Sequence, residues 1–361
     1  MLLTIVVFIA VLASLVLVHE FGHFIAAKKA GCDVEEFGIG FPPRLWSFTY
    51  RKTLYSINLF PIGGFVKIKG ENGDDHPDEK SFVSKSFGWK SLIISAGVLM
   101  NVLMAYVLIS FNLMIGVPME VTPDQNLGRF ARLNDRTVVI TDVLKDSPAE
   151  QAGLQPGDEL RMLDGQIVNA VEGTVNQLAS LHGKSVEITF VRGKETKVTT
   201  ATPALIEEIN REGIGIGLTE TATVSYPWYV APFYGATRTL TIIWLILSAF
   251  AEMIGKLFAH GDVPSDVAGP IGIAVLTGQV ARLGIVQLLQ FAALLSLNLA
   301  VINILPLPAL DGGRLAMIVY ERLRGRKMKL VVEQWIHIIG FAFLILLMIA
   351  VTAKDLYTYL R

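Results

Sequence analysis

The 361-residue chain has a single cysteine, Cys32, and its formal net charge is only −1. One cysteine excludes an internal disulfide and a cysteine-based metal cluster, so we interpret Cys32 as a free thiol. The small net charge gives no indication of nucleic-acid binding. Charged residues make up just 17% of the chain, whereas 52% of it is hydrophobic and the mean hydropathy is +0.51. This composition predicts a membrane protein with a substantial soluble part.

The first apolar stretch, residues 2–18, has no lysine or arginine before it, whereas Lys28 and Lys29 follow it. A cleavable signal peptide carries its positive charge ahead of the apolar core. The reversed order predicts an uncleaved span within residues 1–32, with its N-terminus outside and the two lysines in the cytoplasm.

The segments that follow differ in character. Residues 33–70 mix aromatic and β-branched residues with glycine and proline and show no helical period. We expect them to form strands and turns at the membrane surface. Residues 71–90 are polar, which is typical of a cytoplasmic loop, and residues 91–117 are long and apolar enough for a second span.

Residues 121–222 have ordinary charge content and alternating segments such as RTVVITDVL and SVEITFVRG. This pattern predicts a small β-rich soluble domain outside the membrane. Within it, the stretch Ser147–Gly165 resembles part of a bacterial-type PDZ domain. The resemblance implies an α+β domain that binds peptide C-termini by adding them as a strand to an open sheet edge.

Three apolar stretches remain, at residues 239–258, 285–310 and 331–352, and a basic cluster at 322–329 separates the last two. Basic loops lie in the cytoplasm, so 285–310 has to run from outside to inside. If 239–258 also spanned, 285–310 would deliver the basic cluster to the wrong side. We therefore expect 239–258 to lie on or partly in the outer leaflet.

The predicted fold is a polytopic α-helical membrane protein with four transmembrane helices, a membrane-associated β-hairpin or sheet, and an inserted extracytoplasmic PDZ domain. The segments after that domain are an outer-leaflet region at 223–284, a third span at 285–310, a cytoplasmic basic loop at 311–330 and a fourth span at 331–352.

The first span ends in the sequence VLVHEFGHF, which places three ionisable side chains in an apolar helix. His19 and His23 are four residues apart, so both rings project from one face and can bind one metal ion. Glu20 beside them can act as a general base that activates water, as in a zinc peptidase. The alternative is a helix-packing or proton-relay role, but ionisable groups inside a bilayer are costly and usually functional.

A catalytic zinc ion usually has three protein ligands, so a third ligand is required at the same depth. At about 1.5 Å per residue, His19 lies roughly 25 Å into a bilayer core about 30 Å thick, near its cytoplasmic face. Asp311 ends the third span at that same face and is our candidate ligand. The alternative for Asp311 is a turn or helix-cap residue. His337, inside the last span, is the second candidate ligand.

Five features appear together in one order: HEFGH in the first span, PIGGFVKIKGE at 61–71, Gly97 with Asn101 in the second span, the PDZ-like insertion, and NILPLPALDGG at 303–313. This combination resembles the site-2 intramembrane metalloproteases, most closely the bacterial regulator-of-sigma-E protease group, and covers essentially the whole chain. Two features depart from that group. Val98 stands where proline often follows the glycine, and the chain has room for only one PDZ-like domain.

The resemblance implies one zinc ion per chain, held by His19, His23 and Asp311, with Glu20 as the general base. It also implies that Asn298 and Asn303 hold the substrate backbone. We count Asn101, Gly63 and Gly64 as further candidate substrate-binding residues.

The function predicted from these motifs is zinc-dependent cleavage of transmembrane segments in the bacterial cytoplasmic membrane, as in regulated intramembrane proteolysis of anti-sigma factors. The expected substrates are single-pass membrane proteins that another protease has already trimmed. One alternative keeps the chemistry but applies it to remnant signal peptides. Another is a non-catalytic PDZ membrane adaptor, which predicts no stoichiometric metal.

Overall fold

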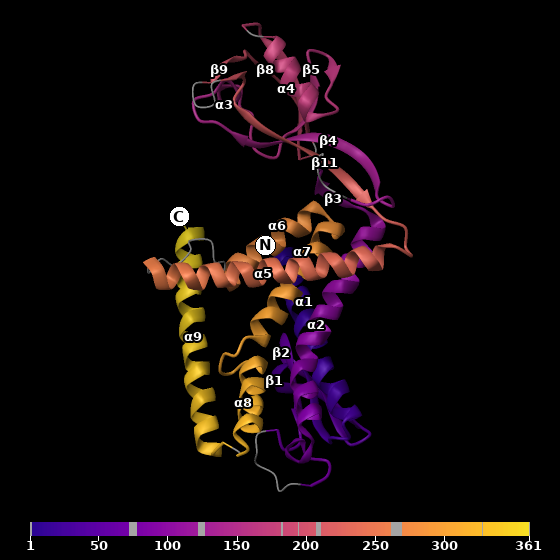
Figure 1. Ribbon diagram of the computed structural model, residues 1–361, viewed down its shortest axis with the longest axis vertical. Coiled ribbons are helices and arrows are strands. Elements are labelled where there is room, and N and C mark those ends of the chain that lie inside the picture. Colours follow the sequence, from indigo (N-terminus) through magenta and orange to yellow (C-terminus); the bar gives the residue numbers. More distant parts are fainter. Residues whose placement is uncertain are drawn as a thin grey trace. The chain divides into compact units, whose positions relative to one another are not determined.

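A computed structural model describes residues 2–71, 78–121, 127–181, 183–193, 195–206, 211–260, 269–326 and 328–360 (Figure 1). The chain forms two compact units. The first combines Met1–Asn112 with Pro232–Arg361, and the second is Leu113–Ala231. The loop expected at 71–90 is therefore described except for 72–77, and the soluble domain expected at 121–222 except for four short gaps.

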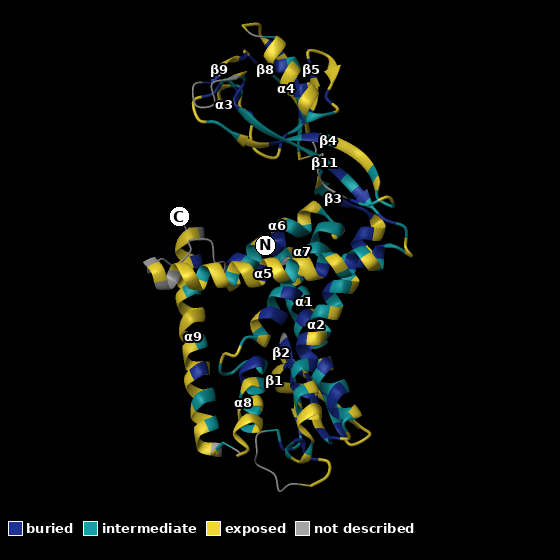
Figure 2. Cartoon of the chain, in the orientation of Figure 1, coloured by how far each residue is buried: buried dark blue, intermediate teal, exposed yellow. Residues whose placement is uncertain are grey.

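The first unit is mainly helical. Its helices are α1 (Leu2–Lys29), α2 (Phe87–Ile115), α5 (Ala231–His260), α6 (Pro270–Leu283), α7 (Ile285–Ile304), α8 (Asp311–Arg324) and α9 (Leu330–Leu360), with a short 3-10 helix η1 (Phe82–Ser84). Most of α9 is coloured as exposed in Figure 2, and many of its exposed residues are large and apolar. A helix that exposes apolar residues all round is suited to lipid surroundings.

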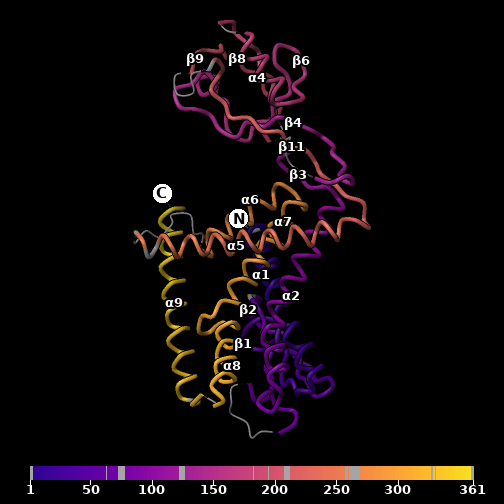
Figure 3. The backbone as a smooth tube through the Cα atoms, in the orientation of Figure 1, coloured from indigo at the N-terminus to yellow at the C-terminus, as the bar shows by residue number. Residues whose placement is uncertain are grey.

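Five of these helices are long and apolar enough to cross a membrane: α1, α2, α5, α7 and α9. The sequence predicted four spans. The fifth candidate, α5, contains residues 239–258, which were not expected to span the membrane. Figures 1 and 3 show α5 running across the direction of α1, α2 and α9 and not along it. Length and composition make α5 a candidate span, and it runs crosswise to α1, α2 and α9.

The strands predicted between 33 and 70 are present as one long hairpin. Strand β1 (Val34–Tyr50) pairs antiparallel with β2 (Thr53–Ile68) beside the turn. Residues 36–39 of β1 pair with two parts of β2, 54–57 and 64–67, so both edges of this part of β1 are paired. At its base, Val34 and Ile68 are buried against α1 and α2. Toward the turn, large apolar side chains are exposed, among them Leu45, Trp46 and Phe48. The hairpin thus joins the helical core at one end and presents an apolar surface at the other.

One expectation of the sequence is corrected here. Residues 311–330 were expected to form a basic loop, but most of them form helix α8. Asp311 lies in its first turn and Arg322 and Arg324 in its last, which complements the helix dipole at both ends. Gly325 follows in the left-handed conformation with φ 69°, as is common after a helix. Its apolar and charged residues lie largely on opposite faces, so the helical period was present in the sequence.

The second unit is a β-rich domain, as predicted. Its main sheet has the order β3-β11-β4-β5-β7-β8, with β6 paired to β5, and β9 and β10 form a separate pair. The strands are β3 (Val117–Glu120), β4 (Arg132–Val143), β5 (Glu159–Leu163), β6 (Gln166–Ile167), β7 (Val186–Arg192), β8 (Glu195–Ala201), β9 (Ala204–Ile206), β10 (Arg211–Gly213) and β11 (Ile216–Ser225). Two helices, α3 (Pro148–Gln151) and α4 (Val171–Ser180), accompany them.

The core of this domain consists of alternating strand residues. Val138, Ile140, Leu160, Leu163 and Ile188 are almost completely buried. At the start of α3, Ser147 caps the helix by accepting a hydrogen bond from the Glu150 amide.

Candidate metal centre

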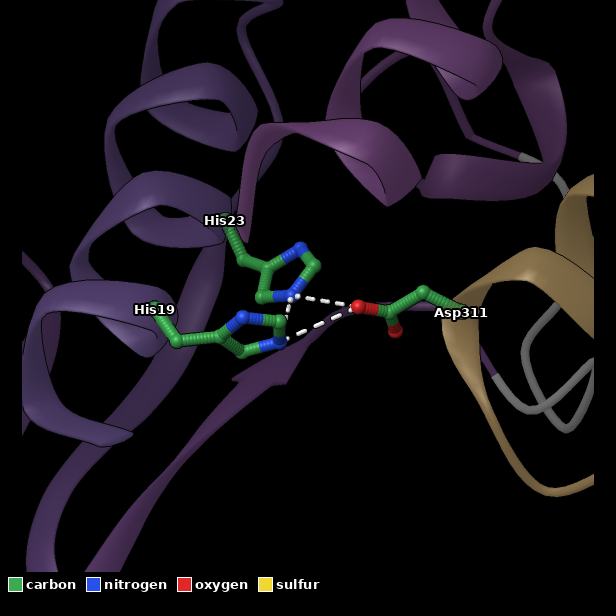
Figure 4. A group of neighbouring side chains, drawn as sticks. All are labelled: His19, His23 and Asp311. Atoms are coloured by element: carbon green, nitrogen blue, oxygen red, sulfur yellow. Dashed lines mark hydrogen bonds and ion pairs between the residues drawn. The ribbon is translucent and has the colours of Figure 1, made fainter. Parts of the chain in front are cut away.

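Three potential metal ligands from the two ends of the chain meet at one point (Figure 4). The Nε2 atoms of His19 and His23, one turn apart on α1, are 3.2 Å from each other. Asp311, the first residue of α8, places Oδ2 3.0 Å from His19 Nε2 and 3.4 Å from His23 Nε2. Within the described part of the chain, this is the one group of three or more such side chains able to hold a metal ion.

The geometry of the three atoms fits a tetrahedral ion. Asp311 Oδ2 is buried and, among the described residues, has no hydrogen-bond partner, although two ring nitrogens are close to it. Ligands about 2.0–2.1 Å from a tetrahedral zinc ion are roughly 3.3 Å apart. The observed separations of 3.0–3.4 Å match this spacing.

Gly97 of α2 leaves the space in which the ligands converge. A Cβ atom at this position would be 2.4 Å from His23 Nε2 and 2.6 Å from His19 Nε2, far inside normal contact. On the facing helix α1, a Cβ on Gly22 would be 2.3 Å from the carbonyl oxygen of Ala96 in α2. Glycines on both helices therefore allow α1 and α2 to touch backbone to backbone at the depth of the histidines.

Each histidine is also held through its other ring nitrogen. His23 Nδ1 lies 2.8 Å from the Ile93 carbonyl oxygen, to which it can only donate. That hydrogen bond puts the proton on Nδ1 and leaves the Nε2 lone pair for a metal. His19 Nδ1 lies 3.3 Å from the side-chain amide of Asn101, which is completely buried.

Glu20 lies next to the ligands on α1 and shares their cavity. This cavity has a volume of about 380 Å³ and is lined by His19, Glu20, His23 and Asp311 and by residues of β2 and α8. Arg314, one turn after Asp311 on α8, forms an ion pair with Glu71 on the same cavity wall. The pair connects the end of the hairpin to the helix that carries Asp311.

The predicted substrate-binding residues occupy different places. Gly64 of β2 lies beside Glu20, since a Cβ on it would be 3.7 Å from Glu20 Cγ. Gly63 has φ +93° and lies against the Phe41 ring. On α7, the Asn298 amide donates to the Leu294 carbonyl at 3.0 Å. Asn303 is half-buried near the end of that helix.

Neither asparagine of α7 is among the described residues that line the cavity. The second candidate ligand, His337, is also outside the ligand group: its Nδ1 accepts a hydrogen bond from the Ala309 amide at 3.3 Å. The geometry thus favours Asp311 over His337.

Sequence reasoning missed the ion pair of Arg314 with Glu71 and the contact of Asn101 with His19. A signal existed for the first, because Arg314 is three residues after Asp311 and so shares its helix face.

Comparison with known proteins agrees with this site. The sequence pattern of peptidase family M50 matches residues 7–347. The chain belongs to peptidase family M50. It is 30% identical to the regulator of sigma-W protease RasP of Bacillus subtilis, covering 98% of each chain. It is 31% identical to the zinc metalloprotease RasP of Shouchella clausii, again over 98% of each.

Among solved structures, the PDZ domain of the SdrC-like protein Lin2157 from Listeria innocua is similar, with 25% identity over 23% of this chain and 92% of that one and a TM-score of 0.21. The family membership confirms the resemblance to site-2 proteases that the motifs indicated. This M50 member is a zinc-dependent intramembrane metalloendopeptidase of regulated proteolysis and an integral membrane protein.

Proposed function

We propose that this M50 peptidase cleaves transmembrane segments of single-pass membrane proteins after another protease has trimmed them. One zinc ion would be held by His19, His23 and Asp311. The observation that carries the proposal is the convergence of these three side chains in a cavity that Glu20 also lines. The name of the B. subtilis relative, a regulator of sigma-W protease, supports substrates of the anti-sigma type.

Four spans in the bacterial cytoplasmic membrane agree best with this arrangement. α5 would lie at the outer surface, since it runs across the other long helices (Figure 1) and carries the exposed ion pair Glu252–Lys256. The site would then be near the cytoplasmic face, because Lys28 and Lys29 follow it at the end of α1.

A substrate helix hides its carbonyl groups in its own hydrogen bonds and has to unwind locally before hydrolysis. Residues 65–68 of β2 line the cavity together with Glu35 of β1, and they pair with the first part of β1. An unwound substrate segment can add beside this part of β2 and replace its lost hydrogen bonds. Gly64, without a side chain, would let the substrate backbone approach Glu20. Asn298 and Asn303 would bond to substrate backbone groups farther along.

In the hydrolytic step, Glu20 takes a proton from the attacking water as the new carbon–oxygen bond forms. It then passes that proton to the amide nitrogen, and the carbon–nitrogen bond breaks with release of the amine. When bound, zinc supplies the Lewis acidity that makes water acidic and stabilises negative charge on the carbonyl oxygen. The hydrogen bond from His23 to Ile93 keeps the ligand face of that ring turned toward the site.

The test compares the wild type with Glu20→Gln, purified in detergent and assayed on a single-pass substrate that lacks its external domain. Both proteins should contain one zinc ion, and the variant should lose cleavage, with a rate reduction of about 10²-fold or more. A remnant signal peptide assayed beside it separates the two substrate classes. Turnover near wild type in Glu20→Gln would refute the base role, and wild type without stoichiometric zinc would favour the adaptor alternative.

We further propose that the soluble domain binds peptide C-termini along β11. Among the described residues, β3 pairs with Thr221–Val224 and the Val121 amide donates to the Glu220 carbonyl, so residues 216–219 of β11 lie outside their ladder. Helix α4 is close by, because the Val171 amide donates to Glu220 Oε1 at 3.0 Å. A peptide added as a strand between them would use both elements.

The full-length protein should therefore bind a peptide with a free C-terminus more tightly than the same peptide with an amidated C-terminus. Equal affinity for both peptides, measured by fluorescence anisotropy, would refute recognition of C-termini.

A further inference from the structure

Asn101 lies deep between three helices, where a substrate has no access. Its side chain is completely buried, its amide faces His19 Nδ1 at 3.3 Å, and its own carbonyl oxygen accepts a hydrogen bond from Ser296 Oγ of α7 at 2.8 Å. The amide oxygen Oδ1 is buried and has no hydrogen-bond partner among the described residues. These contacts place Asn101 behind the metal ligand and away from the cavity.

The role of Asn101 depends on which of the two ring nitrogens of His19 carries the proton. If the Asn101 NH2 group donates to Nδ1, the ring proton is on Nε2, and Nε2 cannot bind a metal. If the amide is turned so that Oδ1 faces the ring, Nδ1–H donates to Oδ1 and Nε2 is free. The two orientations have nearly the same shape, and only the second suits a ring whose Nε2 lies 3.0 Å from Asp311 Oδ2.

We infer that Asn101 is a positioning residue that holds His19 in its metal-binding tautomer and orientation, and does not bind substrate. The inference rests on the proposed zinc site. Removing a residue that hydrogen-bonds to the other ring nitrogen of a metal-binding histidine typically weakens metal affinity by about 10- to 100-fold. Ser296 fixes the backbone of Asn101 from α7, so the orientation of His19 depends on three helices.

Two variants separate positioning from packing. Asn101→Leu keeps the branched shape but removes the acceptor, and Asn101→Asp keeps an acceptor for Nδ1–H. Asn112→Leu is the matched control, because Asn112 is on the same helix, is 1% exposed and bonds to the Val286 carbonyl. Zinc affinity is measured by chelator competition, and the visible spectrum of the Co²⁺-substituted protein reports the ligand geometry.

We expect zinc to bind about 10- to 100-fold more weakly to Asn101→Leu, with an altered Co²⁺ spectrum, and with near wild-type affinity to Asn101→Asp and Asn112→Leu. Wild-type affinity and spectrum in Asn101→Leu would overturn the inference, as would equal losses in all three variants. A wild type that binds no zinc would instead overturn the proposed function.

A second, independent feature lies where α2 begins and α8 ends. A cavity of about 310 Å³ is lined by Phe87 and Lys90 of α2 and by Ile318, Glu321, Arg322, Gly325 and Arg326 of α8 and the residues after it. Three cations therefore surround it with one carboxylate, and Phe87 and Ile318 form an apolar wall.

The lining of this cavity contains more cationic side chains than carboxylates. Arg322 and Arg326 are exposed and form no ion pair in the described ranges. Glu321 Oε1 accepts the Met328 amide at 2.6 Å. Phe87 is the first residue of a candidate span, so the cavity lies at a membrane boundary, and Trp89 of the same turn is 40% exposed. Aromatic residues of this kind are typical of the level of the lipid headgroups.

We propose that this cavity binds the phosphate group of an anionic phospholipid. Basic pockets between transmembrane helices on the cytoplasmic side are typical sites for such headgroups. The apolar wall favours a lipid over free phosphate, because Phe87 and Ile318 can contact the glycerol and the first acyl carbons.

The test uses the full-length protein in detergent and native mass spectrometry with phosphatidylglycerol or phosphatidylcholine. Arg322→Gln with Arg326→Gln removes two cations from the cavity. Arg324→Gln with Lys329→Gln removes two from the same segment outside it, where Arg324 donates to Tyr320 Oη at 2.8 Å. We expect the first pair to weaken phosphatidylglycerol binding by about 30-fold and the second to have little effect.

Equal losses in the two double variants would show general attraction to surface charge and refute a site. Equal binding of phosphatidylcholine and phosphatidylglycerol to the wild type would refute selection of an anionic lipid. Displacement of phosphatidylglycerol by millimolar inorganic phosphate would identify a phosphate site that is not specific for lipid, and would also refute the proposal.

Discussion

Replacing Gly97 with alanine would put a methyl group at the point where the metal ligands converge. The added carbon would be 2.4 Å from His23 Nε2 and 2.6 Å from His19 Nε2, whereas ordinary contacts begin at 3.4 Å. The two nitrogens would have to retreat by about 1.0 and 0.8 Å, several times the roughly 0.2 Å tolerance of a metal–ligand distance. Their second contacts, with Ile93 and Asn101, hold the rings against that retreat.

We therefore expect Gly97→Ala to bind zinc at least about 100-fold more weakly, a loss of about 3 kcal/mol, and to lose peptide cleavage. The matched control is Gly88→Ala on the same helix, where an added Cβ meets nothing within 4 Å. Zinc content is measured by elemental analysis, and gel filtration with thermal unfolding confirms that both variants fold. Stoichiometric zinc with wild-type affinity in folded Gly97→Ala would refute the assignment of this space to a metal.

Three further predictions concern other parts of the chain. Burial raises the pKa of the Cys32 thiol, so maleimide labelling at pH 7–8 should be far slower in the native protein than after unfolding, and should accelerate only at higher pH. Rapid native labelling, detected by mass spectrometry, would contradict this. Asp355 of α9 accepts the Gly269 and Gly272 amides at 3.1 and 2.7 Å. Asp355→Ala should therefore lower the free energy of unfolding by about 1–3 kcal/mol, with a smaller loss for Asp355→Asn; equal thermal stability would disprove the role. Asn303→Ala should raise KM without loss of zinc, and unchanged steady-state kinetics would remove Asn303 from substrate binding.

The three candidate metal ligands were the most predictable part of the site. His19 and His23 stand out because ionisable residues are rare in an apolar helix, and their spacing places both on one face. Asp311 followed from depth and topology, which required the third span to end at the cytoplasmic face. The structure brings all three together.

The surroundings of the ligands could not be predicted in the same way. Gly97 and Gly22 matter because two particular helix faces touch, and hydropathy contains no information on which face of a uniformly apolar helix meets another. The contact of Asn101 with His19 depends on the same crossing.

The fold, too, could be predicted from the sequence only in part. Apolar runs predicted the long helices, and the mixture of aromatic residues and glycines predicted strands at 33–70. The helix α8 was missed although its apolar and charged residues lie largely on opposite faces, because the basic cluster that begins at Arg322 was interpreted as a loop. The number of spans depends on α5, whose orientation is set by its neighbours and not by its own composition.

The distance along the chain between His23 and Asp311 has a consequence for biosynthesis. The ribosome adds the Asp311 carboxylate 288 residues after His23. Until α7 and α8 have been inserted, α1 carries two ring nitrogens with no third ligand, so the growing polypeptide is not yet a peptidase.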